Sequence, residues 1–127
     1  MNYFMTSEKN FENRIKKFLK DDGCWFIKYW GGGEFTKSGI PDILACVNGF
    51  FVGIEVKSSS GTPSELQLVN LKKIDDSGGF GILLYPKDFE KFKSLVDTLD
   101  FGEYPNEYDE LKERWYPKWE QLQKSQL

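Results

Sequence analysis

The sequence predicts an α/β domain in which helices pack on a mixed β-sheet, and three patterns predict it. Apolar residues recur with helical spacing in residues 8–22 and again in residues 87–99. Segments rich in aromatic and β-branched residues occupy 24–30, 39–57 and 80–86, and glycine or asparagine punctuates them. A segment with helix-start signals separates the last two. The expected order is therefore α-β-β-β-α-β-α, followed by a tail.

The first elements follow from local signals. The first helix is expected over about residues 8–22, with Ser7 as its N-cap and Gly23 as its stop. The aromatic segment 24–30 predicts a strand, and the glycine-rich segment 31–39 predicts a loop.

The second helix has unusually clear start signals. Thr62 is the expected N-cap, Pro63 occupies the first helical position, and Glu65 completes a capping box. A buried strand and a third helix follow. The tail from residue 104 is expected to be helical around residues 107–115, with Pro117 limiting this helix. We expect one domain over residues 1–100, with an extension over residues 101–127 that packs on this domain or at a dimer interface.

Composition excludes several classes of protein. With 127 residues and 39% apolar residues, the chain is long enough and apolar enough to form a core. No apolar run approaches the ~20 residues that span a bilayer, and the N-terminus lacks a signal-peptide pattern. A cytoplasmic protein without a membrane partner is expected. Cys24 and Cys46 are too few for a disulfide scaffold and are expected to be reduced core residues.

The absence of histidine restricts the chemistry further. It removes Ser-His and Cys-His nucleophile systems and almost every zinc site. Catalysis would have to depend on carboxylates, lysine and a hard metal such as Mg²⁺. The net charge of −3 argues against a general polyanion binder, but the acidic excess lies in residues 97–127, so a DNA-binding surface on residues 1–96 remains open.

The Asn48-Gly49 pair predicts a two-residue hairpin turn, which fixes the register of the strands on either side. Residues whose numbers sum to 97 should then pair, so Asp42 falls opposite Glu55 and Lys57 lies diagonal to them. All three share one face of the hairpin. The opposite face is entirely apolar.

Two like charges placed directly opposite each other destabilise a sheet, and a divalent cation between them would reverse that effect. Mg²⁺ binds through one or two carboxylates, waters and substrate phosphate. Lys57 would then orient a water or stabilise charge on phosphate. The simpler interpretation makes Asp42 a turn residue and places Glu55 and Lys57 on a solvated strand face.

"GIPDI" followed by "IEVK" resembles the PD-(D/E)XK nuclease superfamily, and most closely its VRR-NUC family, whose small stand-alone members occur in phages and bacteria and are similar to Holliday junction resolvases. The resemblance covers about residues 8–86. It implies a restriction-endonuclease-like α-β-β-β-α-β core, with a helical extension after it in this chain. The motif is short, but three further features support the resemblance: the spacing within the hairpin, the helix before it, and the helix after it that carries Gln67.

The resemblance also implies roles for individual residues. Asp42 and Glu55 would bind metal, the carbonyl of Val56 would be a further ligand, and Lys57 would be the catalytic lysine. Glu12 stands where relatives carry a first-helix glutamate near the metal, although glutamate in a first turn also suits the helix dipole. Gln67 matches a helical glutamine beside the active site; a surface glutamine is the alternative.

DNA contacts are expected at the mouth of this site. Lys37 and Ser38 in the glycine-rich loop are candidate phosphate contacts, as are Lys16 and Lys17 on the first helix, together with Lys20. A flexible connector and a solvated helix surface are the alternatives. The aromatic residues Trp25, Tyr29 and Trp30 could stack on bases, but core packing is the preferred interpretation.

The function expected from these features is a Mg²⁺-dependent endodeoxyribonuclease that resolves Holliday junctions, with Mn²⁺ able to substitute. Two symmetric cuts need two sites, so a homodimer is expected, with exposed aromatics of the tail (Tyr108, Trp115, Trp119) at its interface. Three alternatives stay open: a flap or nicking nuclease, a linear-DNA nuclease, and a DNA-binding protein that has kept the fold without activity.

Overall fold

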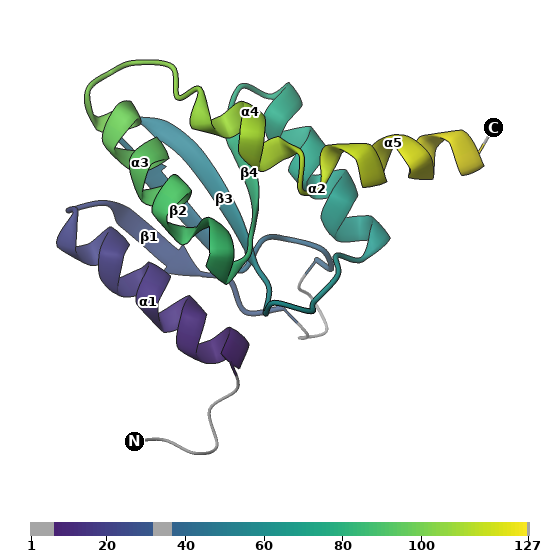
Figure 1. The fold of residues 1–127 in the computed structure, drawn as a ribbon, viewed down its shortest axis with the longest axis horizontal. Helices are drawn as coiled ribbons and strands as arrows, with labels where there is room; N and C mark the ends of the chain where they lie inside the picture. Colours follow the sequence, from purple (N-terminus) through teal and green to yellow (C-terminus); the bar gives the residue numbers. More distant parts are fainter. Residues whose placement is uncertain (1–6, 32–36, 127) are drawn as a thin grey trace.

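The computed structural model describes residues 7–31 and 37–126 of the chain. Its centre is one four-stranded sheet in the order β1-β2-β3-β4 (Figure 1). The strands are β1 (Trp25–Lys28), β2 (Ile43–Val47), β3 (Phe50–Val56) and β4 (Phe80–Leu84). The first three are antiparallel, whereas β3 and β4 are parallel. A parallel pair needs a crossover connection, which helix α2 (Glu65–Asp76) supplies. The mixed sheet with packed helices confirms the predicted fold class.

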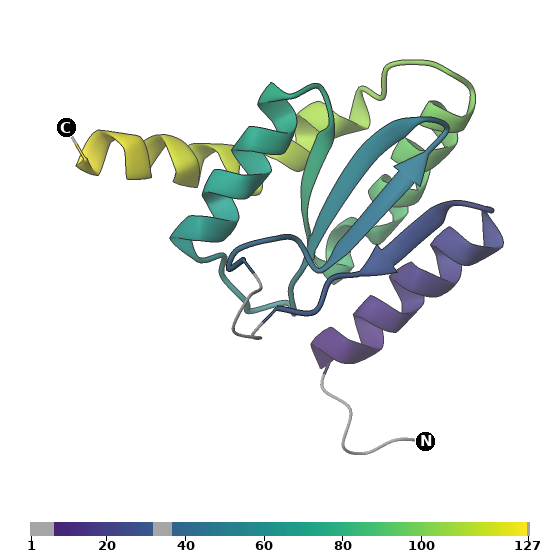
Figure 2. The ribbon, with the colours of Figure 1, turned by 180° about the vertical axis from the view of Figure 1, so that it is seen from behind.

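Helices cover the two faces of this sheet unequally (Figures 1 and 2). Helix α1 (Ser7–Asp21) and helix α3 (Phe89–Asp100) pack on one face, which carries the main core. Phe11 of α1 meets Phe89 of α3 edge to face, with ring centroids 5.6 Å apart. Helix α2 packs on the other face, over β3 and β4. A short 3₁₀ helix, η1 (Pro86–Asp88), leads from β4 into α3.

The first helix ends where the sequence predicts. Gly23 has a φ of +80°, a conformation that favours glycine, and the Cys24 N–H donates to the Leu19 carbonyl at 3.0 Å. The following strand is shorter than predicted and spans only Trp25–Lys28.

The predicted start of α2 is wrong. Ser64, and not Thr62, is the N-cap, and Gln67, and not Glu65, completes the capping box. The Ser64 hydroxyl accepts from the Gln67 N–H at 3.2 Å, and the Gln67 side chain accepts from the Ser64 N–H at 2.9 Å. The segment "TPSELQ" contains two overlapping capping patterns, and the structure selects the later one.

The tail forms two helices, α4 (Glu107–Lys112) and α5 (Tyr116–Ser125). Pro117 was expected to limit a helix, but it lies in the first turn of α5, where a missing N–H costs nothing. The expectation that Tyr108 and Trp115 are exposed is also wrong, because both side chains are buried. Trp115 packs with Leu71 and Leu83 in a second apolar cluster.

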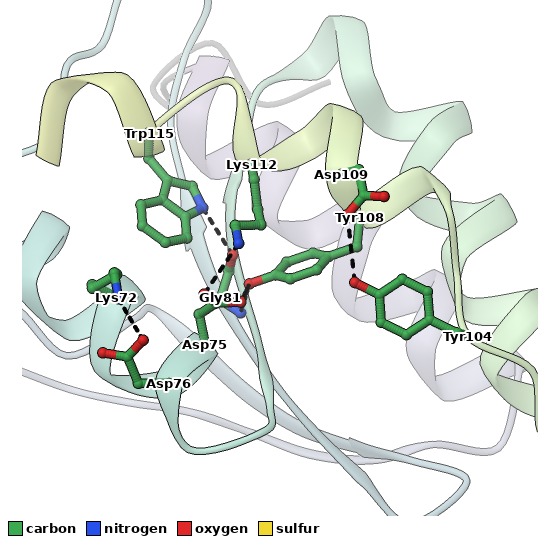
Figure 3. A network of polar contacts seen from close by, with 9 residues as sticks. All are labelled: Lys72, Asp75, Asp76, Gly81, Tyr104, Tyr108, Asp109, Lys112 and Trp115. Atoms are coloured by element: carbon green, nitrogen blue, oxygen red, sulfur yellow. Dashed lines mark hydrogen bonds and ion pairs between the residues drawn. The ribbon is translucent and has the colours of Figure 1, made fainter. Parts of the chain in front are cut away.

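Hydrogen bonds attach this tail to β4 (Figure 3). The Trp115 indole N–H donates to the Gly81 carbonyl at 3.0 Å, and the Gly81 N–H donates to the Tyr108 hydroxyl at 3.1 Å. That hydroxyl donates in turn to Asp75 at 3.0 Å, and Lys112 lies 3.1 Å from the same carboxylate. The tail therefore completes the edge of the sheet beside β4.

Both cysteines are free, as expected, but Cys46 is exposed and does not belong to the core. It lies on the face of β2 that α1 and α3 leave uncovered. None of the described helices combines the length and apolar character needed to cross a membrane.

Candidate active site

The hairpin register places the two predicted carboxyl groups together at one end of the sheet, where the central strands β2 and β3 begin and end. Asn48 and Gly49 both have positive φ values, 47° and 85°, as a type I′ turn requires. Ile43 pairs with Ile54, so the predicted register is confirmed. Asp42 lies one residue before β2, and its Oδ2 accepts a 2.8 Å hydrogen bond from the Val56 N–H. The Asp42 carboxylate is therefore held beside the carboxyl end of β3.

Glu55 is the most unusual group in the site. Its side chain lies in β3 and is only 2% exposed, and its Oε1 has no hydrogen-bond partner. Burial raises the pKa of Glu55 far above its ordinary value of 4.5, and a hydrogen bond to Asp42 and the charge of Asp42 raise it further. Glu55 therefore favours its protonated form near neutral pH. Buried oxygens without partners are rare, and this one belongs to a carboxyl group that lies beside a second carboxyl group, that of Asp42.

Such an arrangement fits a divalent cation. Two carboxyl groups from adjacent strand ends, one with an unsatisfied buried oxygen, are hard oxygen donors of the kind that Mg²⁺ and Mn²⁺ prefer. A bound cation would stabilise the ionised form of Glu55 and satisfy its free oxygen. The residues present therefore fit a metal site.

Glu12 joins this site through a lysine that the sequence analysis missed. Glu12 is only 4% exposed and accepts hydrogen bonds from Lys28 at 2.5 Å and Lys9 at 2.9 Å. The Lys28 Nζ also lies 3.5 Å from Asp42 Oδ1. Lys28 thus connects the glutamate of α1 with the aspartate of the hairpin.

The charges of Glu12 and Lys28 stabilise each other. Burial alone would raise the pKa of Glu12, but the hydrogen bonds from Lys28 and Lys9 lower it below its ordinary value. Burial alone would lower the pKa of Lys28, but the hydrogen bond to Glu12 and the charge of Asp42 raise it. Both groups are therefore ionised near neutral pH, and they form a partly buried ion pair next to Asp42.

Lys57 follows β3 directly and remains half-buried. Its N–H donates to the Leu84 carbonyl at 3.1 Å, which continues the pairing of β3 with β4. The positive charge of Lys57 opposes the rise in the pKa of Glu55, so the ammonium lies within electrostatic reach of that carboxyl. The structure thus brings Asp42, Glu55, Lys57 and Glu12 to one end of the sheet.

A comparison with protein families identifies the family of this chain. The model of the archaeal Holliday junction resolvase (Hjc) family matches residues 6–76, from α1 to the end of α2. This match covers more than half of the chain and includes Glu12, Asp42, Glu55 and Lys57. The chain belongs to the Hjc family. No curated protein and no solved structure matches it significantly.

Membership of the Hjc family makes this chain a Holliday-junction-resolvase-like endonuclease within the PD-(D/E)XK superfamily, and it implies binding to DNA. The resemblance implied a core with the element order α-β-β-β-α-β. The structure shows this order from α1 to β4. Nucleases of this kind use divalent metals, in agreement with the donor set around Glu55.

A pocket of about 400 Å³ adjoins the carboxyl groups of Asp42 and Glu55. Asp42 lines it together with residues from three segments: Lys28, Tyr29, Trp30, Gly31, Lys37, Ser38, Gly39, Ile40 and Gln67. The predicted DNA contacts Lys37 and Ser38 therefore lie beside the site. Residues 32–36 of the same glycine-rich loop lie outside the described part of the chain.

Gln67 lies in this pocket, but its side-chain oxygen is already bound to the Ser64 N–H. It stabilises the start of α2 at the edge of the pocket. The neighbouring Gly39 has a φ of +82° and packs so closely that an added Cβ would lie 2.7 Å from the Leu66 Cβ. The loop and the helix start are therefore fixed against each other.

The two lysines of α1 differ in position. Lys16 Nζ lies 3.4 Å from Glu12, on the side of the helix that faces the site. Lys17 instead pairs with Asp21 at 2.7 Å on an exposed surface and lines a groove with Phe89. The structure brings Lys16 to the site and leaves Lys17 away from it.

The prediction that the aromatic residues of segment 24–30 pack in the core is wrong for two of them. Trp25 is 65% exposed and Trp30 is 71% exposed. Trp30 lines the pocket beside Asp42, and the ammonium groups of Lys9 and Lys28 each lie 5.6 Å from its ring centre. Trp30 is thus available at the mouth of the site.

A separate group of carboxylates, Asp22, Asp97 and Asp100, lies at the other end of α1 and is exposed. Partial burial, with a hydrogen bond to Asp22 and its negative charge, raises the pKa of Asp100 to about 6. This group shares no residue with the candidate active site.

Proposed function

We propose that this chain is a divalent-metal-dependent endonuclease that hydrolyses phosphodiester bonds in branched DNA, with the four-way junction as its main substrate. The observation that carries this proposal is the buried Glu55 carboxyl, which faces Asp42 and leaves one oxygen without a partner. A buried polar group in this state costs about 1–3 kcal/mol, so a ligand that satisfies it is a reasonable cause for its presence.

Asp42 and Glu55 would hold the metal, and the carbonyl of Val56 would be a further ligand. Mg²⁺ is the proposed ion and Mn²⁺ the substitute, because all three donors are oxygens. When bound, such an ion lowers the pKa of a coordinated water and neutralises charge on the phosphate.

The protein's own residues then have distinct tasks. The Val56 N–H and Lys28 fix the orientation of the Asp42 carboxylate. Glu12 holds Lys28 in place through their 2.5 Å hydrogen bond. Lys57 orients the attacking water or stabilises charge on the phosphate.

In the proposed reaction, the water oxygen bonds to phosphorus while the bond from phosphorus to the 3′ oxygen breaks. The 3′ oxygen takes up a proton, so the products carry a 5′-phosphate and a 3′-hydroxyl. Lys37, Ser38 and Lys16 would contact DNA phosphates near this point, since they lie at or beside the pocket. Lys17 is a weaker candidate because of its position.

We further propose that the protein acts as a homodimer, because two symmetric cuts need two sites. An apolar surface supports self-association: Trp25, Ile27 and Phe51 are exposed on the face of the sheet that α1 and α3 leave open. Sedimentation should give a dimer at micromolar concentration. A monomer with full resolving activity would contradict this part of the proposal.

The finer placement within the superfamily is also proposed. The "GIPDI" and "IEVK" segments support a VRR-NUC-like, phage-type nuclease that acts in the cytoplasm of a bacterial host.

The chemistry is tested by cleavage of a four-way junction, a flap, a linear duplex and single-stranded DNA in Mg²⁺. Wild-type protein should cut the junction fastest, while Asp42→Ala and Lys57→Ala should lower the rate by about 10²-fold or more. Wild-type rates in both variants would refute the site. Cleavage of flaps or linear DNA alone would replace the proposed substrate.

Metal binding is tested independently by thermal unfolding with and without Mg²⁺ or Mn²⁺. Metal that binds only the folded state raises the melting temperature. Glu55→Gln should lose this rise, whereas Glu65→Gln, an exposed glutamate in the first turn of α2, should keep it. An unchanged rise in Glu55→Gln would exclude Glu55 as a ligand.

A further inference from the structure

We propose that the C-terminal extension forms a second DNA-phosphate contact surface beside the active site. The surface is a pocket of about 380 Å³, which we term the extension pocket. Its cations come from two elements outside the Hjc match: Lys87 from η1, and Arg114 and Lys118 from the extension. This inference rests on the proposed function only for the identity of the ligand, which is DNA.

The extension pocket is continuous with the catalytic strand end. Its floor includes Ser59, Ser60 and Gly61, in the segment that follows Lys57 directly. Gly61 packs against the Lys57 side chain, because a Cβ added there would lie 3.2 Å from Lys57 Cδ. The Tyr85 hydroxyl donates to the Gly61 carbonyl at 2.9 Å and holds this segment on β4. A DNA strand at Lys57 would therefore meet the extension pocket next.

The chemistry of the lining suits phosphate oxygens. Lys87 and Lys118 form no ion pair with any residue in the described ranges, so their charges are available. The hydroxyls of Ser59, Ser60 and Thr62 add neutral hydrogen-bond donors. Glu113 is the one acidic residue of this lining. Lysine and hydroxyl donors together are the usual phosphate contacts of DNA-binding proteins.

Arg114 has a different task in this surface. Its Nε and Nη2 donate to the two oxygens of Asp88, both at 2.9 Å, and Asp88 is buried. The pair is therefore neutral, and it fixes the extension against η1. This attachment places Lys118 on the same pocket as Lys87.

The acidic residues of the extension do not cancel this surface. Three of its six acidic residues, Asp109, Glu113 and Glu120, line a different pocket together with Lys112, and of these three only Glu113 also lines the extension pocket. Lys112 is itself paired with Asp75. The charges of α4 and α5 are thus divided between two sides, and Arg114 and Lys118 lie on the side of the active site. The net charge of −3 for the whole chain does not reveal that acidic and basic residues of the extension lie on different sides.

The test compares two double variants in DNA binding without cleavage. Lys87→Gln/Lys118→Gln removes the proposed contacts. Lys73→Gln/Lys124→Gln removes two lysines that form no ion pair with the residues that the structure describes and that lie outside the extension pocket. Binding of a labelled four-way junction and of a linear duplex is measured by fluorescence anisotropy in a metal chelator, between about 50 and 200 mM salt.

For the first variant, we expect the slope of log K against log salt to fall in magnitude by about 2, because each lost phosphate contact removes about one released counterion. The loss should be similar for junction and duplex, since backbone contacts carry no sequence information. The control variant should keep the wild-type slope.

The proposal is overturned if Lys87→Gln/Lys118→Gln keeps the wild-type slope of log K against log salt. That result is expected if the extension pocket binds free phosphate and not DNA. An equal reduction in both variants would also overturn it, because the effect would then be general charge. Because the assay needs no cleavage, an inactive wild-type protein would refute the proposed nuclease function and leave this inference decidable.

Discussion

Lys28 holds together two acidic residues that come from distant parts of the chain. It hydrogen bonds to Glu12 of α1 at 2.5 Å and lies 3.5 Å from Asp42 of the hairpin. The lysine is the last residue of β1, and its side chain faces α1 while Trp25 and Ile27 face outward. The ion pair thus sets the position of β1 relative to the hairpin that carries Asp42.

Lys28→Met should therefore destabilise the protein by about 1–2 kcal/mol. Removing one partner leaves the nearly buried Glu12 with fewer donors, although Lys9 and Lys16 remain. Lys17→Met is the matched control, because its partner Asp21 is exposed and such pairs contribute about 0–1 kcal/mol. Urea unfolding measures both values. Equal effects of the two substitutions would show that Lys28 is only a surface lysine.

Asp100→Asn should change the dependence of stability on pH. The folded-state pKa of Asp100, about 6, exceeds its ordinary value of 3.8. Its contribution to stability is therefore fully present below pH 3.8 and is lost as the pH rises through about 6. The variant should match wild type at pH 3.5 and be more stable at pH 8, by about 0.5 kcal/mol because solvent screens exposed charges.

Thermal unfolding at the two pH values, with a metal chelator present, measures this difference. Glu103→Gln removes an exposed carboxyl group outside the Asp22, Asp97 and Asp100 cluster and serves as the control. A gain in stability at pH 3.5 equal to the gain at pH 8 would contradict the assignment.

The residues of the site were predictable to different degrees. Asp42 and Glu55 could be placed opposite each other because the Asn48-Gly49 turn admits one register. The position of Lys28 beside Glu12 could not be predicted, because the alternation of side chains along β1 does not reveal which face of the sheet α1 covers. The sequence did contain one indication of this contact. Lys28 lies at the end of a predicted strand, and Glu12 lies beside the apolar positions of the preceding helix.

At the scale of elements, the start of α2 shapes the mouth of the candidate active site. The Ser64 and Gln67 capping box begins the helix at Glu65, and Gly39 of the glycine-rich loop packs on Leu66 in the first turn. The pocket beside Asp42 therefore depends on where this helix begins.

Ser64→Ala should cost about 1 kcal/mol, the usual effect of losing an N-cap side chain. Thr62→Ala should cost little, because Thr62 is exposed and does not cap the helix. Chemical unfolding of both variants measures the difference. A larger loss of stability for Thr62→Ala than for Ser64→Ala would show that Thr62 is the N-cap, as the sequence suggested.

The error at this helix has a physical origin. Thr62-Pro63 followed by Glu65 and Ser64 followed by Gln67 are both plausible starts, and they lie two residues apart. Local propensity does not separate them. The contact between Gly39 and Leu66, which is remote in sequence, is made only with the later start.

At the scale of the whole molecule, the extension is part of the hydrophobic core. Trp115 is completely buried against Leu71 and Leu83, and its indole N–H is bound to Gly81 of β4. The sequence did not predict this packing, because an aromatic and charged tail is equally compatible with an exposed interface. Only the position of β4 next to α2 creates the groove that Trp115 fills.

Trp115→Ala should therefore lower the free energy of unfolding by about 3–5 kcal/mol, as for other large core residues. Trp119→Ala, a half-buried tryptophan in α5, should cost about 1 kcal/mol. Guanidinium unfolding of both variants tests this. Similar small losses would mean that the extension is dispensable for the fold.

The two bonds from the extension to Gly81 also imply an order of events during translation. Synthesis proceeds from the N-terminus, so the hairpin with Asp42 and Glu55 leaves the ribosome before β4 and long before Trp115. Until these later residues emerge, β3 lacks its parallel neighbour and the second apolar cluster is open to water. The proposed nuclease should therefore gain its activity only after α5 has been synthesised, and ribosome-bound intermediates should leave nearby DNA uncut.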